Sequence, residues 1–141
     1  YCSNEQGCSV TVLEMSRSGT LATAQTVSTI PPEYDEPNSC ADIEVTPDGK
    51  FVYVSNRGHD SIARFSVSEG SGLLHPRGQT RTEKTPRSFN ISPSGRFLYV
   101  AGQASGKLAA YKIDPKTGAL DHFAAYPTGR RPWWVLVVDG R

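Results

Sequence analysis

The sequence predicts an all-β fold, and two features of the chain support this prediction. Short runs of β-favouring residues alternate with turns that contain Gly or Pro about every ten positions, and no segment has the 3.6-residue period of a helix. The same arrangement also recurs after 46 positions, where Tyr53 matches Tyr99 and Pro86 matches Pro132. Repeats of about 40 to 50 residues that hold only strands are typical of propeller blades. We therefore predict a β-propeller, with about three four-stranded blades in this chain.

The domain is expected to span residues 1–141 as a partial propeller, and its first repeat unit covers approximately 1–46. The segment 30–40 holds three prolines and several acidic side chains, so we expect an exposed loop there. Strands of this unit are expected at 1–4, 8–15, 21–28 and 43–45.

The second and third units cover approximately 47–92 and 93–138. The turns Asp48-Gly49 and Ser94-Gly95 precede their first strands, and both turns contain residues that favour tight turns. Strands are expected at 51–56, 61–67, 73–80, 89–92, 97–102, 107–113 and 120–126. A last strand at 133–138 is expected to open a fourth unit that does not continue.

The strands that begin the second and third units are apolar on both faces, at 51–54 and 97–100. A sheet with one solvated face shows alternation, so these strands are expected to lie between two other sheets. This favours a propeller over a simple sandwich. Propellers close with about 4 to 8 blades, so the ring requires further blades. They come either from an upstream part of a parent chain, which we favour, or from other copies of this chain.

Composition narrows the function. Fifteen Lys and Arg against fourteen Asp and Glu leave a formal charge of +1, which does not suggest binding to nucleic acid or to an anionic membrane. Three cysteines cannot all pair within the chain, and the spacing of Cys2, Cys8 and Cys40 matches no zinc pattern. We expect reduced thiols and a cytoplasmic setting, with a Cys2–Cys8 bridge as the alternative. No metal or other cofactor is predicted.

In a blade of antiparallel strands, successive connections alternate between the two ends. The loops around Arg57 and His59 are therefore expected on the same rim as the starts of the innermost strands, which carry Asp42, Arg87 and Asn90. Guanidinium groups bind phosphate or carboxylate oxygens in a bidentate way, and a nearby carboxylate or histidine can act as a general base. The rim is a candidate site for an anionic ligand.

Each of these residues also has a structural interpretation. Arg57 could hold its loop through backbone carbonyls, and His59 could be an ordinary loop residue. Asp42 is equally compatible with either role, whereas Arg87 begins an innermost strand and is committed to the channel mouth. Trp133 and Trp134 occupy the repeat positions of Arg87 and Ser88, and either pack the channel wall or stack on a sugar.

The run Thr46-Pro47-Asp48-Gly49 followed by Phe51 to Ile62, with its Asn-Arg-Gly-His-Asp segment, resembles the lactonase family of seven-bladed β-propellers. The segments that begin Pro86-Arg87 and Pro132-Trp133 resemble it too. This family includes bacterial propeller-type 6-phosphogluconolactonases and fungal carboxymuconate cyclases. The resemblance covers nearly the whole chain and suggests the C-terminal part of such a protein, whose last strand would close the ring with N-terminal strands.

The resemblance implies hydrolysis of a sugar-acid lactone without a metal, with 6-phosphogluconolactone as the expected substrate. Arg57 and Arg87 would bind the anionic group or the developing oxyanion. His59 and Asn90 are expected to contribute to substrate binding because of their place on the rim, although His59 does not obviously replace a histidine that relatives supply from an earlier blade. Asp42 would act as acid or base, although many relatives carry Glu there. A carboxymuconate cyclase and a non-catalytic binding propeller remain alternatives. We expect the fragment to be inactive without the remaining blades.

Overall fold

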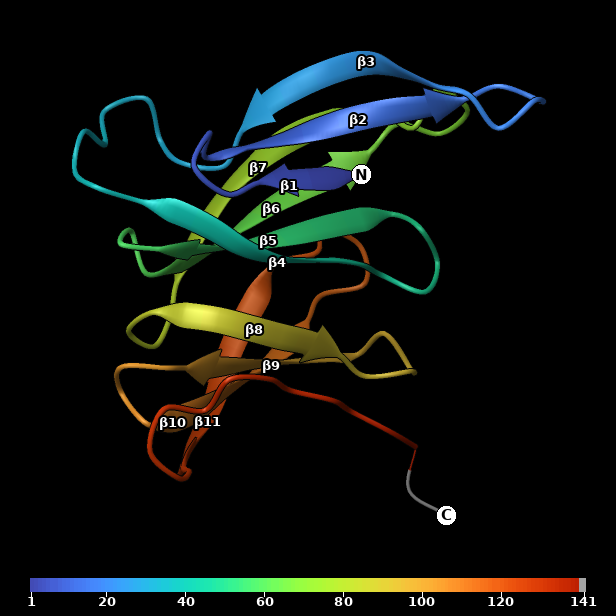
Figure 1. The fold of residues 1–141 in the computed structure, drawn as a ribbon. Helices are drawn as coiled ribbons and strands as arrows, with labels where there is room; N and C mark the ends of the chain where they lie inside the picture. Colours follow the sequence, from blue (N-terminus) through green and yellow to red (C-terminus); the bar gives the residue numbers. More distant parts are fainter. Residues whose placement is uncertain (140–141) are drawn as a thin grey trace.

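The computed structural model describes residues 1–139, and these residues form eleven β-strands in three antiparallel sheets, without a helix (Figure 1). The first sheet has three strands and the other two have four, each in simple consecutive order. The strands are β1 (Cys2–Asn4), β2 (Ser9–Met15) and β3 (Leu21–Ser28); β4 (Ser39–Val45), β5 (Phe51–Arg57), β6 (Ser61–Val67) and β7 (Leu74–Arg81); β8 (Pro86–Ile91), β9 (Phe97–Gly102), β10 (Lys107–Ile113) and β11 (Leu120–Pro127).

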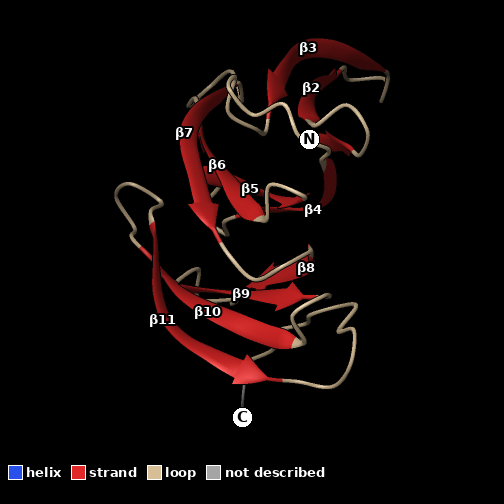
Figure 2. Cartoon of the chain, turned by 90° about the vertical axis from the view of Figure 1, so that its left-hand side faces the viewer, coloured by secondary structure: helices blue, strands red, loops and turns tan. Residues whose placement is uncertain are grey.

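The three sheets follow one another in space, with β4 and β8 on one side and β7 and β11 on the other (Figure 2). Two apolar cores separate them. Phe51 and Tyr53 of β5 belong to the core shared with the third sheet, which includes Phe89. Val52 and Val54 belong to the core shared with the first sheet. The prediction that this strand lies between two other sheets is therefore confirmed.

Specific polar contacts also join the second and third sheets. The buried Tyr53 hydroxyl donates a hydrogen bond to the Gly118 carbonyl at 2.7 Å. Gly118 has φ +68°, and a Cβ there would lie 2.5 Å from the Phe51 ring, so only glycine allows this close approach. The loops at this end of the sheets thus help to fix the angle between the two sheets.

The innermost strands β4 and β8 are linked by side chains that cross from one sheet to the next. Asp42 accepts a hydrogen bond from the Phe89 amide at 3.1 Å, and Glu44 accepts one from the Asn90 side chain at 2.9 Å. The contacts recur one repeat later, where Ser88 and Asn90 accept bonds from the amides of Val135 and Val137. We call these four contacts the inner ladder.

Three strand predictions need correction. The innermost strand of the third sheet begins at Pro86 rather than at 89, because Pro86 pairs with Gly102. The innermost strand of the second sheet begins at Ser39 rather than at 43, because the Cys40 amide bonds the Glu5 carbonyl at 2.9 Å and Ser39 pairs with Arg57. Residues 133–138 form no strand, because among the described residues they have no backbone ladder partner and are held by the side chains of β8. Most of the other strand predictions agree within one or two residues.

The cysteines are free thiols. Cys2 lies opposite Thr11 in the ladder of β1 and β2, whereas Cys8 lies in the turn that connects these two strands. The alternative Cys2–Cys8 bridge therefore does not form. Cys40 is buried, and its burial raises the pKa of the thiol above the usual value. The predicted cytoplasmic setting is not decided by these thiols and stays a prediction.

Candidate functional site

A polar cavity of about 480 Å³ lies where the first, second and third sheets meet at the predicted rim. It is formed by the end of β1, the beginnings of β4 and β8, the end of β5 and the C-terminal segment. Three of the five predicted site residues line it. The lining residues are Glu5, Ala41, Asp42, Arg57, Arg87, Ser88, Trp133 and Trp134.

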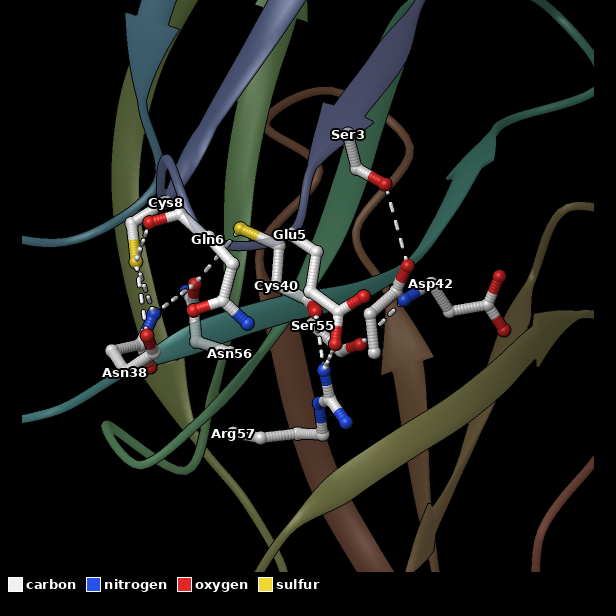
Figure 3. Close-up of polar contacts among 11 residues, drawn as sticks. Ser3, Glu5, Gln6, Cys8, Asn38, Cys40, Asp42, Ser55, Asn56 and Arg57 are labelled. Atoms are coloured by element: carbon white, nitrogen blue, oxygen red, sulfur yellow. Dashed lines mark hydrogen bonds and ion pairs between the residues drawn. The ribbon is translucent and has the colours of Figure 1, made fainter.

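Arg57 is the last residue of β5 and is held in place by two partners. Its Nη2 donates to the Cys40 carbonyl at 2.9 Å and forms an ion pair with the Glu5 carboxylate (Figure 3). The Arg57 side chain is only 15% exposed, whereas that of Glu5 is 61% exposed. The ion pair therefore lies at the border between the protein interior and the cavity.

The Nε of Arg57 is buried and has no hydrogen-bond acceptor among the described residues. A buried N–H group without an acceptor costs free energy, about 1–3 kcal/mol for a neutral group and more for a charged one. Arg64 also has such an Nε atom, but Arg64 does not line the cavity.

Arg87 is the second residue of β8 and reaches the cavity from the opposite side. Its guanidinium carbon lies 3.7 Å from the centroid of the Trp133 ring, in a cation–π contact. The cavity thus contains two guanidinium groups that are held in different ways, Arg57 by a carboxylate and a carbonyl, and Arg87 by an aromatic ring.

Asp42 lines the same cavity, but both of its carboxylate oxygens already accept backbone hydrogen bonds. Oδ1 accepts from the Ile43 amide at 3.0 Å and Oδ2 from the Phe89 amide at 3.1 Å. In Figure 3 its carboxylate points away from the Glu5–Arg57 pair. Asp42 therefore has a structural function in the inner ladder, and its predicted catalytic role stays a prediction.

His59 does not line the cavity. It is 6% exposed, its Nδ1 lies 2.7 Å from the Ser61 hydroxyl, and its ring packs edge-on against Tyr34 at 4.7 Å. Burial lowers the pKa of His59 below its usual value, and the nearby Arg81 guanidinium lowers it further. These contacts favour a structural role over the predicted substrate contact.

Asn90 is also outside the cavity lining. Its amide nitrogen donates to Glu44 and its carbonyl oxygen accepts from the Val137 amide, so both ends of the side chain are occupied. The pKa of Glu44 is raised, mainly by burial, while the Asn90 hydrogen bond opposes this shift and the Asp42 charge adds to it. Asn90 is placed as a link between neighbouring inner strands.

Glu5 lines the cavity but is not among the site residues predicted from the sequence. The repeat nevertheless contains a signal for it, because Ser3-Asn4-Glu5 ends the first strand in the way that Ser55-Asn56-Arg57 ends the fifth. Asn4-Glu5 and Asn56-Arg57 lie at equivalent strand ends of neighbouring sheets, and the side chains of Glu5 and Arg57 form the ion pair. Aligning these strand ends identifies Glu5 as a rim residue.

A second cavity, of about 500 Å³, lies between the turns at the opposite end of the second and third sheets, around Pro47, Gly95 and Pro115. It contains none of the predicted site residues and is lined largely by apolar side chains. Within residues 1–139 there is no group of three or more His, Cys, Asp or Glu side chains placed to hold a metal ion. The same residues include no helix able to cross a membrane.

The profile of the family described as "Lactonase, 7-bladed beta-propeller" matches residues 1–137. The chain belongs to this family. The resemblance seen in the sequence is thereby confirmed, and the three sheets are blades of a seven-bladed propeller.

Individual relatives agree with the family. The chain is 40% identical over 139 residues to a 6-phosphogluconolactonase of Pectobacterium carotovorum and 41% identical over 139 residues to one of Sodalis glossinidius. Each match covers 98% of this chain and 42% of the relative. The chain therefore spans less than half of the length of these relatives. The extent of the overlap does not support the more specific expectation that the chain is their C-terminal part.

Solved structures show the same fold. A putative 6-phosphogluconolactonase from Bacteroides fragilis superposes with a TM-score of 0.88 at 32% identity, over 96% of this chain and 37% of that one. A periplasmic gluconolactonase from Pseudomonas aeruginosa superposes with a TM-score of 0.84 at 30% identity, over 89% of this chain and 35% of that one.

Proposed function

We propose that this chain contributes its polar cavity to a lactonase, which hydrolyses a lactone that carries an anionic group. The observation that carries this proposal is that two arginines, Arg57 and Arg87, line the same cavity. Two guanidinium groups around one polar cavity favour an anionic ligand, because each can donate two parallel hydrogen bonds to phosphate or carboxylate oxygens.

The residues of the cavity suit the addition of water to a lactone carbonyl. Attack of water converts the carbonyl oxygen into an oxyanion, and a guanidinium group placed beside it stabilises the developing charge. The attacking water must lose a proton, and the exposed Glu5 carboxylate can accept it. Collapse of the intermediate breaks the ring C–O bond, and the ring oxygen leaves as a hydroxyl by taking up the proton that Glu5 accepted from water.

Either Glu5 or Asp42 could be the general base. Glu5 is the stronger candidate, because its carboxylate borders the cavity and is bonded to a side chain, whereas both oxygens of Asp42 accept backbone hydrogen bonds. The ion pair with Arg57 holds the Glu5 carboxylate at the edge of the cavity.

The finer assignment of the substrate is 6-phosphogluconolactone. The relatives named 6-phosphogluconolactonase support it, and so does the suitability of two guanidinium groups for a phosphate. The other partners of the site would be the remaining blades of the ring, which complete the walls of the channel. We propose a cytoplasmic setting for this activity, on the basis of the unpaired cysteines predicted from the sequence.

The test places this chain in a complete ring by substituting it for the matched 139 residues of the Pectobacterium carotovorum relative. We expect hydrolysis of 6-phosphogluconolactone above its spontaneous rate, with a loss of about 100-fold or more in Arg57→Ala and Arg87→Ala. Arg64→Ala is the matched control, because it removes a guanidinium group with a buried Nε that lies outside the cavity.

The two candidate bases are separated in the same assay by Glu5→Gln and Asp42→Asn, each with its unfolding temperature measured. Loss of turnover at unchanged stability in Glu5→Gln assigns the base to Glu5. A folded ring that does not accelerate hydrolysis overturns the proposal, and muconates would then be assayed as the ligands of a cyclase.

A further inference from the structure

Arg87 and Trp133 occupy equivalent positions of neighbouring repeats, 46 residues apart, and their side chains are in contact. The guanidinium carbon lies 3.7 Å from the Trp133 ring centroid, within the range of a stacked cation–π pair. Both side chains line the polar cavity. The third blade and the start of the next repeat therefore meet in an arginine–aromatic pair at the candidate site.

The C-terminal segment that carries Trp133 is fixed to β8 by two inner-ladder bonds. The Val135 amide donates to Ser88 at 3.2 Å and the Val137 amide donates to Asn90 at 2.8 Å. Because these bonds join residues two and four positions beyond Trp133, they hold the beginning of the segment beside Arg87. The stacking is thus supported by backbone anchoring as well as by the ring itself.

The two cavity arginines differ in how their charge is oriented. Arg57 is held by Glu5 and by the Cys40 carbonyl. Arg87 takes part in no ion pair among the described residues, and its guanidinium group lies over the Trp133 ring. A guanidinium group that lies over an aromatic face keeps the N–H groups at its edge free for hydrogen bonding.

We propose that Trp133 is a positioning residue for anion binding: it orients the guanidinium group of Arg87 so that its N–H edge faces the polar cavity. This inference rests on the proposed function for its role in turnover, but the orientation of Arg87 can be measured without any lactone. Trp133 itself touches no reacting atom. Its contribution is to reduce the number of orientations that the Arg87 side chain samples before a ligand arrives.

Trp134 provides a matched control. It lines the same cavity and is 73% exposed, compared with 60% for Trp133, and it has no recorded stacking contact with Arg87. Replacing either tryptophan removes a similar exposed aromatic surface. Only replacement of Trp133 removes the ring on which Arg87 lies.

The first measurement is the NMR spectrum of the completed ring used for the activity assay, with Arg87 assigned. The ring current of Trp133 is expected to shift the Arg87 side-chain CH₂ signals upfield. This shift should disappear in Trp133→Leu, persist in Trp133→Phe and persist in Trp134→Leu. The backbone amide signals of Val135 and Val137 report whether the segment stays on β8 in each variant.

The second measurement is a titration of the same four proteins with inorganic phosphate. We expect Trp133→Leu to weaken phosphate binding by about three- to fivefold, the loss of a partly exposed cation–π contact. Trp133→Phe and Trp134→Leu should bind within about twofold of the unsubstituted ring.

The outcomes distinguish the two proposals. An Arg87 shift that is unchanged in Trp133→Leu, or equal weakening of binding by Trp133→Leu and Trp134→Leu, overturns the positioning role. Failure of the unsubstituted ring to bind phosphate while the Arg87 shift depends on Trp133 counts against the proposed anion site and leaves the stacking established.

Discussion

At the scale of single residues, side chains that look catalytic in the sequence divide into two groups. Arg57 and Arg87 present guanidinium groups to a polar cavity. His59 and Asn90 use their polar atoms in contacts that hold loops and strands together. Asp42 belongs to both groups, because it lines the cavity and accepts the Phe89 amide of the next blade.

A pH dependence of stability is expected from His59. Its pKa is lowered in the folded state by burial and by Arg81, so the unfolded chain binds the additional proton more readily as pH falls through the usual value of 6.5. The contribution of the neutral His59 side chain to the stability of the folded state is therefore fully present above pH 6.5 and is lost as the pH decreases below this value. Urea unfolding at pH 7.5 and at pH 5.5 should show a smaller difference in His59→Gln than in the original chain.

The control for this prediction is His122→Gln, at an exposed histidine of β11, where the loss of stability on acidification should be retained because His59 is intact. An unaltered pH dependence in His59→Gln would show that other groups cause the effect and would reopen a role for His59 at the rim.

Gly58 is the most tightly packed backbone position of the Asn-Arg-Gly-His-Asp segment. It has φ +122°, and a Cβ would lie 2.2 Å from the Pro37 carbonyl oxygen, so the loop at residues 29–38 packs directly on its backbone. We expect Gly58→Ala to destabilise the chain by about 3 kcal/mol, measured by chemical denaturation.

Gly19 offers a matched control, because it also has positive φ, at +83°, but a Cβ there would meet no atom within 4 Å. Gly19→Ala should cost only about 1 kcal/mol, the strain of the left-handed conformation alone. Equal costs for the two substitutions would contradict the close packing of the loop on Gly58.

Arg57 and Arg87 could be predicted from the sequence because each stands at a strand end whose side of the blade follows from alternation. Asp42 was predicted beside the start of its strand, although it is the middle residue of β4. Sequence reasoning did not reach Glu5, which comes from a neighbouring blade and meets Arg57 only through the angle between two sheets. His59 and Asn90 share the rim with the arginines, but the direction of a side chain depends on packing partners such as Tyr34 and Glu44 that periodicity does not reveal.

At the scale of elements, the inner ladder shows how consecutive blades are joined near the channel. Asp42 and Ser88 are equivalent residues of β4 and β8, and each accepts the backbone amide found 47 residues further along the chain. Glu44 and Asn90 continue the pattern two residues later. Short polar side chains on innermost strands thus bond from one blade to the next.

This pattern makes specific predictions for hydrogen exchange. Asn90→Ala should accelerate exchange of the Val137 amide more than that of Val135, and Ser88→Ala should do the reverse, because each substitution removes one acceptor. Equal acceleration of both amides in either variant would mean that the C-terminal segment detaches as a unit rather than bond by bond.

Sequence periodicity predicted the strands well where both hydrogen-bonding partners lie within the chain, as for β5 and β9. It predicted a strand at 133–138 from the same composition, but composition does not reveal whether a neighbouring strand is available. Among the described residues no backbone ladder reaches this segment, so its β-favouring residues remain extended beside β8.

At the scale of the whole molecule, the two outer sheets each have a face that no other blade of this chain covers. Met15 and Leu21 on the first sheet, Phe123 and Tyr126 on the third, and Leu136 on the C-terminal segment are exposed large apolar side chains. Exposed apolar surface and unpaired strand edges favour association. The chain therefore presents surfaces that the remaining blades would cover.

We expect the 141-residue chain to self-associate as its concentration rises, as measured by sedimentation velocity. Leu136→Lys should reduce this association, because the side chain is exposed and its backbone is not one of the inner-ladder donors. The completed ring used for the activity assay should remain a monomer under the same conditions. Self-association of that ring would show that a surface other than the uncovered blade faces causes the association.

The inner ladder has a geometric consequence. Since one side chain spans the gap between neighbouring inner strands, its length acts as a spacer that sets how far apart those strands lie at that level. The side chains of Asp42 and Ser88 are short and reach the backbone of the next strand. The Glu44 side chain is longer, and it contacts the Asn90 side chain rather than the backbone. A repeat of this kind therefore sets the spacing of its own inner strands. Because Asp42 and Ser88 also line the cavity, changing the side-chain length at either position would change the spacing of the strands and the width of the cavity together.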